Sequence, residues 1–319
     1  MKKISIYFLI SLVFISCKTD SKIDNEIALI NADFEVERFD QIFMETSPEN
    51  LPELKADYPF MFSRNFNDSV WIRRMQDSLQ IELKDEVQAT FGNFETEYSE
   101  IELLFKHLKY HFKEFKIPRV ITVTSDVDYR NKVIATDSIV LLALDNYLGS
   151  EHKFYDGIQQ YLKLNFRKEM LVSDMAEAYA SNYIYQSNSR TFLDDMIYSG
   201  KLLYFKDVII PFKSDAIKIG YREDQLEWAQ ANESYIWRYF VEKELLYSTD
   251  PKLAARFINP APFSKFNLEL DRESPGRLGQ YIGWQIVRAY MENTDSPLKQ
   301  LLTANAEDIF KNSRFKPRK

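Results

Sequence analysis

A glycine-marked helix near the carboxyl end places the strongest constraint on the fold. Three of the eight glycines in this 319-residue chain lie in residues 274–291, SPGRLGQYIGWQIVRAYM. Ser274 and Pro275 are typical of a helix start, and apolar residues follow at helical spacing. Gly279 and Gly283 are four residues apart, so they share one face of the helix. Because glycine lets another backbone approach closely, that face either packs against a neighbouring element or forms one wall of a cleft.

The rest of the chain predicts an α+β fold that is predominantly helical. Residues 50–116 and most residues after 150 have helical periodicity, and Gly and Pro are scarce. Between residues 119 and 147, β-branched and alternating residues predict two or three strands, and FEVERF at 34–39 predicts another short strand. Since there is no internal repeat and no second linker, we expect residues 34–319 to form a single globular domain with a small sheet.

The amino terminus has the pattern of an exported lipoprotein. MKKISIYFLISLVFISC combines two lysines with an apolar run that is too short to span a bilayer, which predicts a signal peptide over residues 1–16. Its end resembles a bacterial lipobox, which implies cleavage before Cys17 and acylation of that cysteine, the only one in the chain. The lipid would anchor the protein to a membrane, and residues 17–33 would form the lipid anchor and a polar tether. The alternative is a plain signal peptide with a chance cysteine.

Charge argues against nucleic acid as a partner. The net charge is −7, and the only sizeable basic run is the terminal RFKPRK. A nucleic-acid-binding protein normally presents a basic face. We therefore expect no nucleic-acid binding.

Few residues offer recognisable chemistry. His107 and His111, in HLKYH, have the spacing of two zinc ligands on one helical face. However, Leu108 stands where a zinc peptidase needs the glutamate that activates water, and nearby lysines would repel a metal ion. We interpret the pair as partly exposed residues on the flank of the helix. GxSxG, P-loop and CxxC motifs do not occur, so the residues alone assign no catalytic group, metal ligand or cofactor.

Four segments resemble the gliding-motility lipoprotein GldB family of gliding and related Bacteroidota. They are FLDDMIYSGKLLYF (192–205), NESYIWRYFVEKELLYSTDPKLAARFI (232–258), APFSKF (261–266) and ESPGRLGQYIGWQIVRAYM (273–291). With the lipobox and the strand IVLLALDNYLG, the resemblance covers nearly the whole chain.

That family is in turn similar to zinc peptidases that have lost the metal motif. In the active relatives a helix carries HExxH, whereas the matching helix here, LVSDMAEAY, has Ser173, Asp174 and Glu177 and no histidine. Ser199 stands where a metal-binding glutamate would precede Gly200. The resemblance therefore implies a degenerate zincin-like domain that cannot assemble a zinc shell. The cleft left behind would be lined by Asp174, Glu177, Ser199, Glu233 and Trp237. Alternatively, the cleft has collapsed and is filled by aromatic side chains.

The resemblance implies a non-catalytic, lipid-anchored envelope protein that gliding motility requires. It would be a structural or assembly component of the gliding and type IX secretion apparatus, anchored through acylated Cys17 and contacting other proteins of that apparatus. Its body would lie outside the cytoplasm, on the periplasmic side. Two alternatives remain open. One is a metallopeptidase-like hydrolase that uses atypical ligands such as His107 and His111, and the other is a lipoprotein that binds a peptide or glycan in the cleft.

Overall fold

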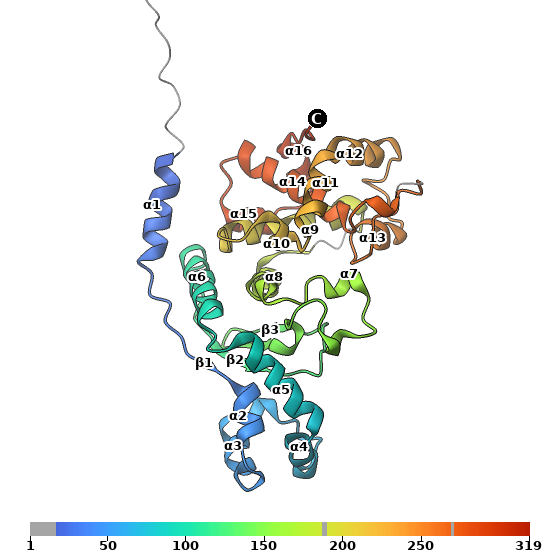
Figure 1. Ribbon diagram of the computed structural model, residues 1–319. Helices are drawn as coiled ribbons and strands as arrows, with labels where there is room; N and C mark the ends of the chain where they lie inside the picture. The colour runs from blue at the N-terminus through green and yellow to red at the C-terminus, as the bar shows by residue number, and fades with distance from the viewer. Residues whose placement is uncertain (1–16, 187–189, 269–270) are drawn as a thin grey trace, which may run out of the picture.

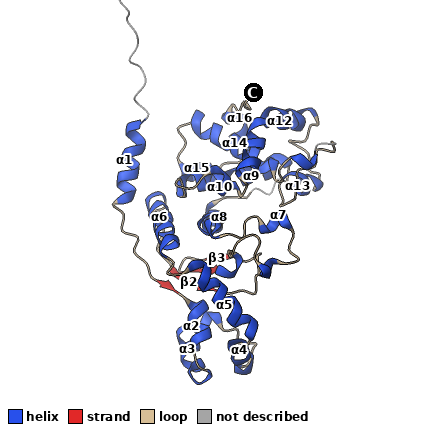
Figure 2. Ribbon diagram, viewed as in Figure 1, coloured by secondary structure: helices blue, strands red, loops and turns tan. Residues whose placement is uncertain are grey.

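The computed structural model describes residues 17–186, 190–268 and 271–319 (Figure 1). The predicted signal peptide, residues 1–16, lies outside the described residues. Helices dominate, and one small sheet lies among them (Figure 2), which confirms the predominantly helical α+β class.

Helices occupy most of the described chain. They are α1 (Cys17–Ala28), α2 (Phe39–Glu45), α3 (Leu51–Asp57), α4 (Asp68–Met75), α5 (Ser78–Phe91), α6 (Glu95–His111), α7 (Gln160–Lys163), α8 (Leu171–Tyr183), α9 (Phe192–Ile209), α10 (Asp215–Ile219), α11 (Glu223–Ala231), α12 (Glu233–Glu242), α13 (Lys252–Phe257), α14 (Leu278–Asn293), α15 (Leu298–Thr303) and α16 (Ala306–Ser313).

The sheet has four strands in the order β1-β2-β4-β3. These are β1 (Val36–Glu37), β2 (Arg119–Val123), β3 (Val133–Ala135) and β4 (Ile139–Ala143). β1 and β4 both run parallel to β2, whereas β3 pairs antiparallel with β4 and forms one edge. The short strand in FEVERF and the strands expected between residues 119 and 147 are confirmed.

The two faces of the sheet pack against different helices. Because successive strand residues point to opposite faces, Val120 joins the apolar cluster that includes residues of α6 and α8, and Ile121 joins the cluster formed with α2, α3 and α4. Helices α2, α3 and α4 therefore cover one face of the sheet, and α6 and α8 cover the other (Figure 1).

Helix α9 connects this core to a second, carboxyl-terminal core. Phe205 and Ile209 near its end pack with α6 and α8, whereas Phe192 and Met196 near its start pack with residues of α12, α13 and α14. A helix that is apolar around most of its circumference is expected to be buried on all sides. This explains why FLDDMIYSGKLLYF shows little amphipathic character.

The glycine face of α14 packs directly against α9. A Cβ added at Gly283 would lie 1.8 Å from the carbonyl oxygen of Met196, and a Cβ added at Gly200 would lie 2.3 Å from the carbonyl oxygen of Gly283. Such distances leave no room for a side chain. Of the two interpretations of this face, close helix packing is therefore the one that the structure supports.

Two local predictions were wrong. Ser274 does not cap α14, because its hydroxyl donates to the Asp271 carbonyl at 2.7 Å and α14 starts only at Leu278, after Arg277. The helix containing the two histidines ends at His111, whereas helical periodicity predicted a helix up to residue 116. Residues 17–28 of the segment expected to be the lipid anchor and polar tether form the helix α1, in which Ile27 is buried; the role of this segment stays a prediction.

Candidate functional site

The exposed side of α8 faces a cavity of about 650 Å³. The opposite side of the helix, including Met175, Ala176 and Tyr179, is buried in the apolar core. Asp174 and Glu177, three residues apart and thus on one face, line the cavity. The remaining lining residues come from the loop at 129–132, the segment 150–170, α9, the segment 218–225 and the loops at 260–262 and 276–277.

The loop after β2 that carries Lys132 has an unusual backbone. Asp126 and Val127 have positive φ angles of 55° and 58°. The buried carboxylate of Asp145 accepts hydrogen bonds from the backbone N–H groups of Ser125 and Val127, at 3.0 and 2.7 Å. A left-handed β-branched residue such as Val127 is strained, so these bonds help to hold the loop in place. The same carboxylate is buried, and burial raises its pKa.

Asp174 is bound by two groups on the sheet side of the cavity. Lys132 makes an ion pair with its carboxylate, and the Tyr147 hydroxyl donates to the same oxygen, Oδ2, at 2.9 Å. The Lys132 ammonium also lies 5.5 Å from the centre of the Tyr147 ring. Burial, followed by the nearby Asp174 charge, raises the pKa of Tyr147 well above its usual value, so this phenol stays protonated and acts as a donor.

Glu177 is bound by a lysine from α9. The Lys206 ammonium lies 2.7 Å from Oε2 of Glu177, and it also donates to the Lys218 carbonyl at 3.1 Å. This lysine side chain is only 4% exposed, whereas 57% of the Glu177 side chain is accessible. The Lys206 charge, with smaller contributions from Lys132 and Arg277, holds the pKa of Glu177 below its usual value. Glu177 is therefore an ionised carboxylate in a cationic surrounding.

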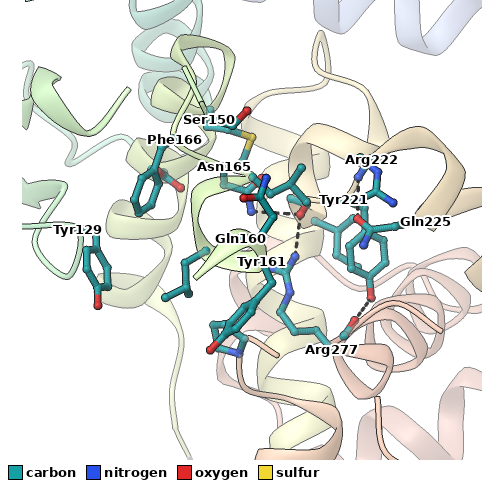
Figure 3. Close-up of a pocket in the computed structure, with 18 of the residues that line it drawn as sticks. Tyr129, Ser150, Gln160, Tyr161, Asn165, Phe166, Tyr221, Arg222, Gln225 and Arg277 are labelled. Atoms are coloured by element: carbon teal, nitrogen blue, oxygen red, sulfur yellow. Dashed lines mark hydrogen bonds between the residues drawn. The ribbon is translucent and has the colours of Figure 1, made fainter. Parts of the chain in front are cut away.

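Arg277 lines the cavity on the α14 side. Its guanidinium donates to the Gly220 carbonyl at 2.7 Å and lies 5.2 Å from the centre of the Tyr221 ring. The Asn165 amide donates to the same carbonyl at 3.1 Å. Figure 3 shows the Arg277 side chain between Tyr161 and Tyr221, reaching the carbonyl that Asn165 also contacts.

The five residues predicted to line one cleft do not lie together. Asp174 and Glu177 line the cavity described above. Glu233, which is buried, lines a different pocket and accepts a hydrogen bond from the Tyr281 hydroxyl at 2.7 Å. Trp237 packs against the rings of Phe310 and Phe315. Ser199 is buried in α9, and its hydroxyl donates to the Asp195 carbonyl at 2.9 Å.

Ser173, at the first position of the helix segment compared with HExxH, has a structural contact. Its buried hydroxyl donates to the Ile217 carbonyl at 3.2 Å. In the parts of the chain that the structure describes, no three His, Cys, Asp or Glu side chains gather closely enough to hold a metal ion.

Of the two histidines of α6, His111 is partly exposed as expected, whereas His107 is not. His107 is buried, and its Nδ1 has no hydrogen-bond partner among the described residues. Burial lowers the pKa of His107 and lowers that of His111 to about 4. Both imidazoles are therefore neutral at pH 7. Neither histidine is among the residues that line the cavity.

The predicted lipid attachment site lies at the first described residue. Cys17 is the first residue of α1. Among residues 17–186, 190–268 and 271–319, the structure contains no helix with the length and hydropathy needed to cross a membrane.

Sequence reasoning missed the cationic side of the cavity. Lys132, Lys206 and Arg277 come from three distant parts of the chain, and none belongs to a spaced motif. Two signals were available. Lys206 follows the apolar run LLYF in α9, and Arg277 stands two residues before a glycine at the start of the glycine-marked helix.

Comparison with known proteins gives one match. A family model described as "Gliding motility protein GldB" matches residues 20–317, a range that includes every residue lining the cavity. No curated protein and no solved structure matches the chain. The similarity to zinc peptidases stays a prediction.

Proposed function

The chain belongs to the family of the gliding motility protein GldB, and on that premise we propose that it is a non-catalytic, lipid-anchored component of the gliding apparatus in the cell envelope. The family match carries this proposal, because it extends over nearly the whole chain rather than one motif. Acylation at Cys17 would fix the protein to the membrane. The body would then support or help to assemble the gliding and type IX secretion machinery from the periplasmic side.

The chemistry around α8 supports a non-catalytic role. A zinc peptidase needs lone pairs that are free to bind the metal and a carboxylate that can act on water. Here Asp174 is paired with Lys132 and Tyr147, and Glu177 is paired with Lys206. Ammonium groups at both carboxylates compete electrostatically with a divalent cation. These contacts favour a carboxylate pair with a structural or ligand-positioning role.

The proposal is tested by complementing a deletion strain and measuring spreading and single-cell gliding. We expect the deletion strain to stop gliding and the wild-type gene to restore gliding. Cys17→Ser should not restore it, because the protein then lacks its lipid. Asp174→Asn and Ser199→Ala should restore it, since neither position carries out a reaction.

Protein levels and membrane fractionation provide the control for each strain. A deletion strain that still glides would contradict the motility role. Loss of gliding in Asp174→Asn or Ser199→Ala, at normal protein level, would instead show that chemistry or binding around these residues is essential.

A second function, ligand binding, is favoured by one observation. The cavity beside α8 has the volume of a pocket for a small ligand and combines aromatic, cationic and anionic side chains. This keeps the peptide- or glycan-binding alternative as a second candidate. The hydrolase based on His107 and His111 has no comparable support, because neither histidine lines the cavity.

A further inference from the structure

One cation in the cavity differs from the others in having no acidic partner. Among the described residues, each of the other lining cations forms an ion pair: Lys132 with Asp174, Lys206 with Glu177, Lys218 with Asp207 and Arg222 with Asp224. Within the ranges that the structure describes, no carboxylate lies within 4.0 Å of the guanidinium nitrogens of Arg277. The one hydrogen bond of this guanidinium there goes to the Gly220 carbonyl. A guanidinium carries five N–H groups, so most of its donor capacity is left for a ligand.

The backbone holds this arginine in a fixed position. Arg277 has a φ angle of 60°, which is uncommon for a residue with a long side chain. The preceding Gly276 lies so close to the Ala261 carbonyl oxygen that an added Cβ would be 2.3 Å from it. The Tyr221 hydroxyl also donates to the Gly276 carbonyl (Figure 3). A strained but firmly held residue in a cavity indicates a preorganised binding group.

The cavity also offers acceptors for N–H groups. Oδ1 of Asn165 is buried and has no hydrogen-bond partner among the described residues. A buried acceptor without a partner is unfavourable, so a donor from a ligand would be stabilising there. Glu177 uses Oε2 to contact Lys206, and more than half of its side chain remains accessible. The cavity thus combines a carboxylate-binding guanidinium with acceptors for neutral N–H groups.

We propose that this cavity binds the carboxyl-terminal end of a peptide. Arg277 pairs with the terminal carboxylate through its planar fork, and Asn165 and Glu177 accept hydrogen bonds from amide N–H groups of the same peptide. The cations near Glu177 favour a ligand that is anionic rather than one with a free amine. A volume of about 650 Å³ suits an end of a few residues. The inference rests on the ligand-binding function proposed above as a second candidate.

Calorimetric titration of the full-length lipoprotein in detergent micelles tests this assignment. The probe is N-acetyl-tri-L-alanine with a free carboxylate, and its C-terminal amide is the matched ligand control. Comparison with N-acetyl-tri-D-alanine shows whether the cavity prefers a carboxyl-terminal end made of L-residues or one made of D-residues. We expect one of the two free acids to bind and its amide to bind at least tenfold more weakly.

Variants assign the effect to Arg277. Arg277→Gln should weaken binding of the free acid at least tenfold, and Arg277→Lys, which keeps the charge but loses the fork, about threefold. Arg238→Gln is the matched control, because it removes an exposed guanidinium that does not line the cavity, and it should change binding by less than twofold. If Arg277→Gln does not fold, as judged by thermal melting, Arg277→Lys and the amide peptide carry the test.

Three results would overturn the inference: no binding of either free acid, equal binding of acid and amide, or inorganic phosphate binding as tightly as the peptide. Complementation of the deletion strain distinguishes failure of the peptide-binding inference from failure of the proposed motility role. A deletion strain that glides refutes the motility role whatever the titrations show. Absence of peptide binding together with gliding restored by Arg277→Gln refutes only the peptide site.

Discussion

At the scale of single residues, His111 shows burial overriding a favourable helix end. It is the last residue of α6, where the helix dipole favours a cation by roughly 0.3–1 kcal/mol. Nevertheless burial, followed by electrostatic interactions with His107 and Lys113, lowers its pKa to about 4. The local environment therefore favours the neutral imidazole.

This shift predicts a loss of stability in acid. The unfolded imidazole takes up a proton near pH 6.5 and the folded one near pH 4. Between these values the unfolded chain binds more protons, so the free energy of unfolding falls as the pH falls through this window and levels off below it. His111→Gln should remove this part, on the order of 3 kcal/mol between pH 7 and pH 4. Denaturant unfolding at several pH values measures it.

His152→Gln is the control for this measurement. His152 contacts Glu86 and lies outside α6, so this variant leaves His111 in place and should keep the acid sensitivity that His111 causes. An acid sensitivity of His111→Gln equal to that of the wild type would show that His111 does not titrate as described.

The residue scale also shows where sequence reasoning ends. Asp174 and Glu177 were expected to line a cleft because the resemblance matches their helix to the HExxH helix of zinc peptidases, and the structure puts both at the cavity. Arg277 could not be found in the same way, because its role depends on a left-handed backbone and on Gly220 and Tyr221, more than 50 residues earlier in the chain. Ser274 looked like a helix cap, but its hydroxyl binds carbonyls of the preceding loop.

At the scale of elements, the crossing of α9 and α14 is the contact that the glycines explain. Gly200 and Gly283 remove side chains where the two backbones meet. The sequence indicated either a close contact or a cleft wall for the α14 face, because interior glycines weaken a helix by roughly 1 kcal/mol and need a compensating reason. It did not identify α9 as the partner, since the matching glycine lies 83 positions earlier (283 − 200).

Gly283→Ala should therefore destabilise the protein, although alanine is the better helix former. The added methyl group would lie 1.8 Å from the Met196 carbonyl oxygen, so the helices must separate. We expect a loss of roughly 3 kcal/mol in the free energy of unfolding, measured by denaturant titration. Glu292→Ala, at an exposed position of the same helix, should be nearly neutral. A Gly283→Ala protein as stable as the wild type would contradict the packing explanation.

At the scale of the whole molecule, α9 joins two apolar cores that the sequence did not separate. Helical and strand periodicity was enough for the class, the strands and most helices, because these signals are local. The cavity was not predictable, since its walls come from segments between residues 129 and 277 that only the tertiary fold brings together. For the same reason Glu233 and Trp237, predicted to share a cleft with Asp174, lie elsewhere.

The amino-terminal helix gives the anchor a short reach. Twelve residues of α1 span about 18 Å as a helix, against about 40 Å if extended. The helix is docked through buried Ile27 and through Glu26, whose carboxylate accepts from the Tyr110 hydroxyl at 3.1 Å. With a lipid on Cys17, the globular body could move only a short distance away from the bilayer. Its partners would then have to lie close to the membrane surface.

A twelve-residue Gly-Ser insertion after Ala28 tests this consequence. It should impair gliding while leaving membrane anchoring intact, whereas the same insertion after exposed Asn65 should not. Unchanged gliding with the insertion after Ala28 would mean that gliding does not depend on the distance between the bilayer and the globular body.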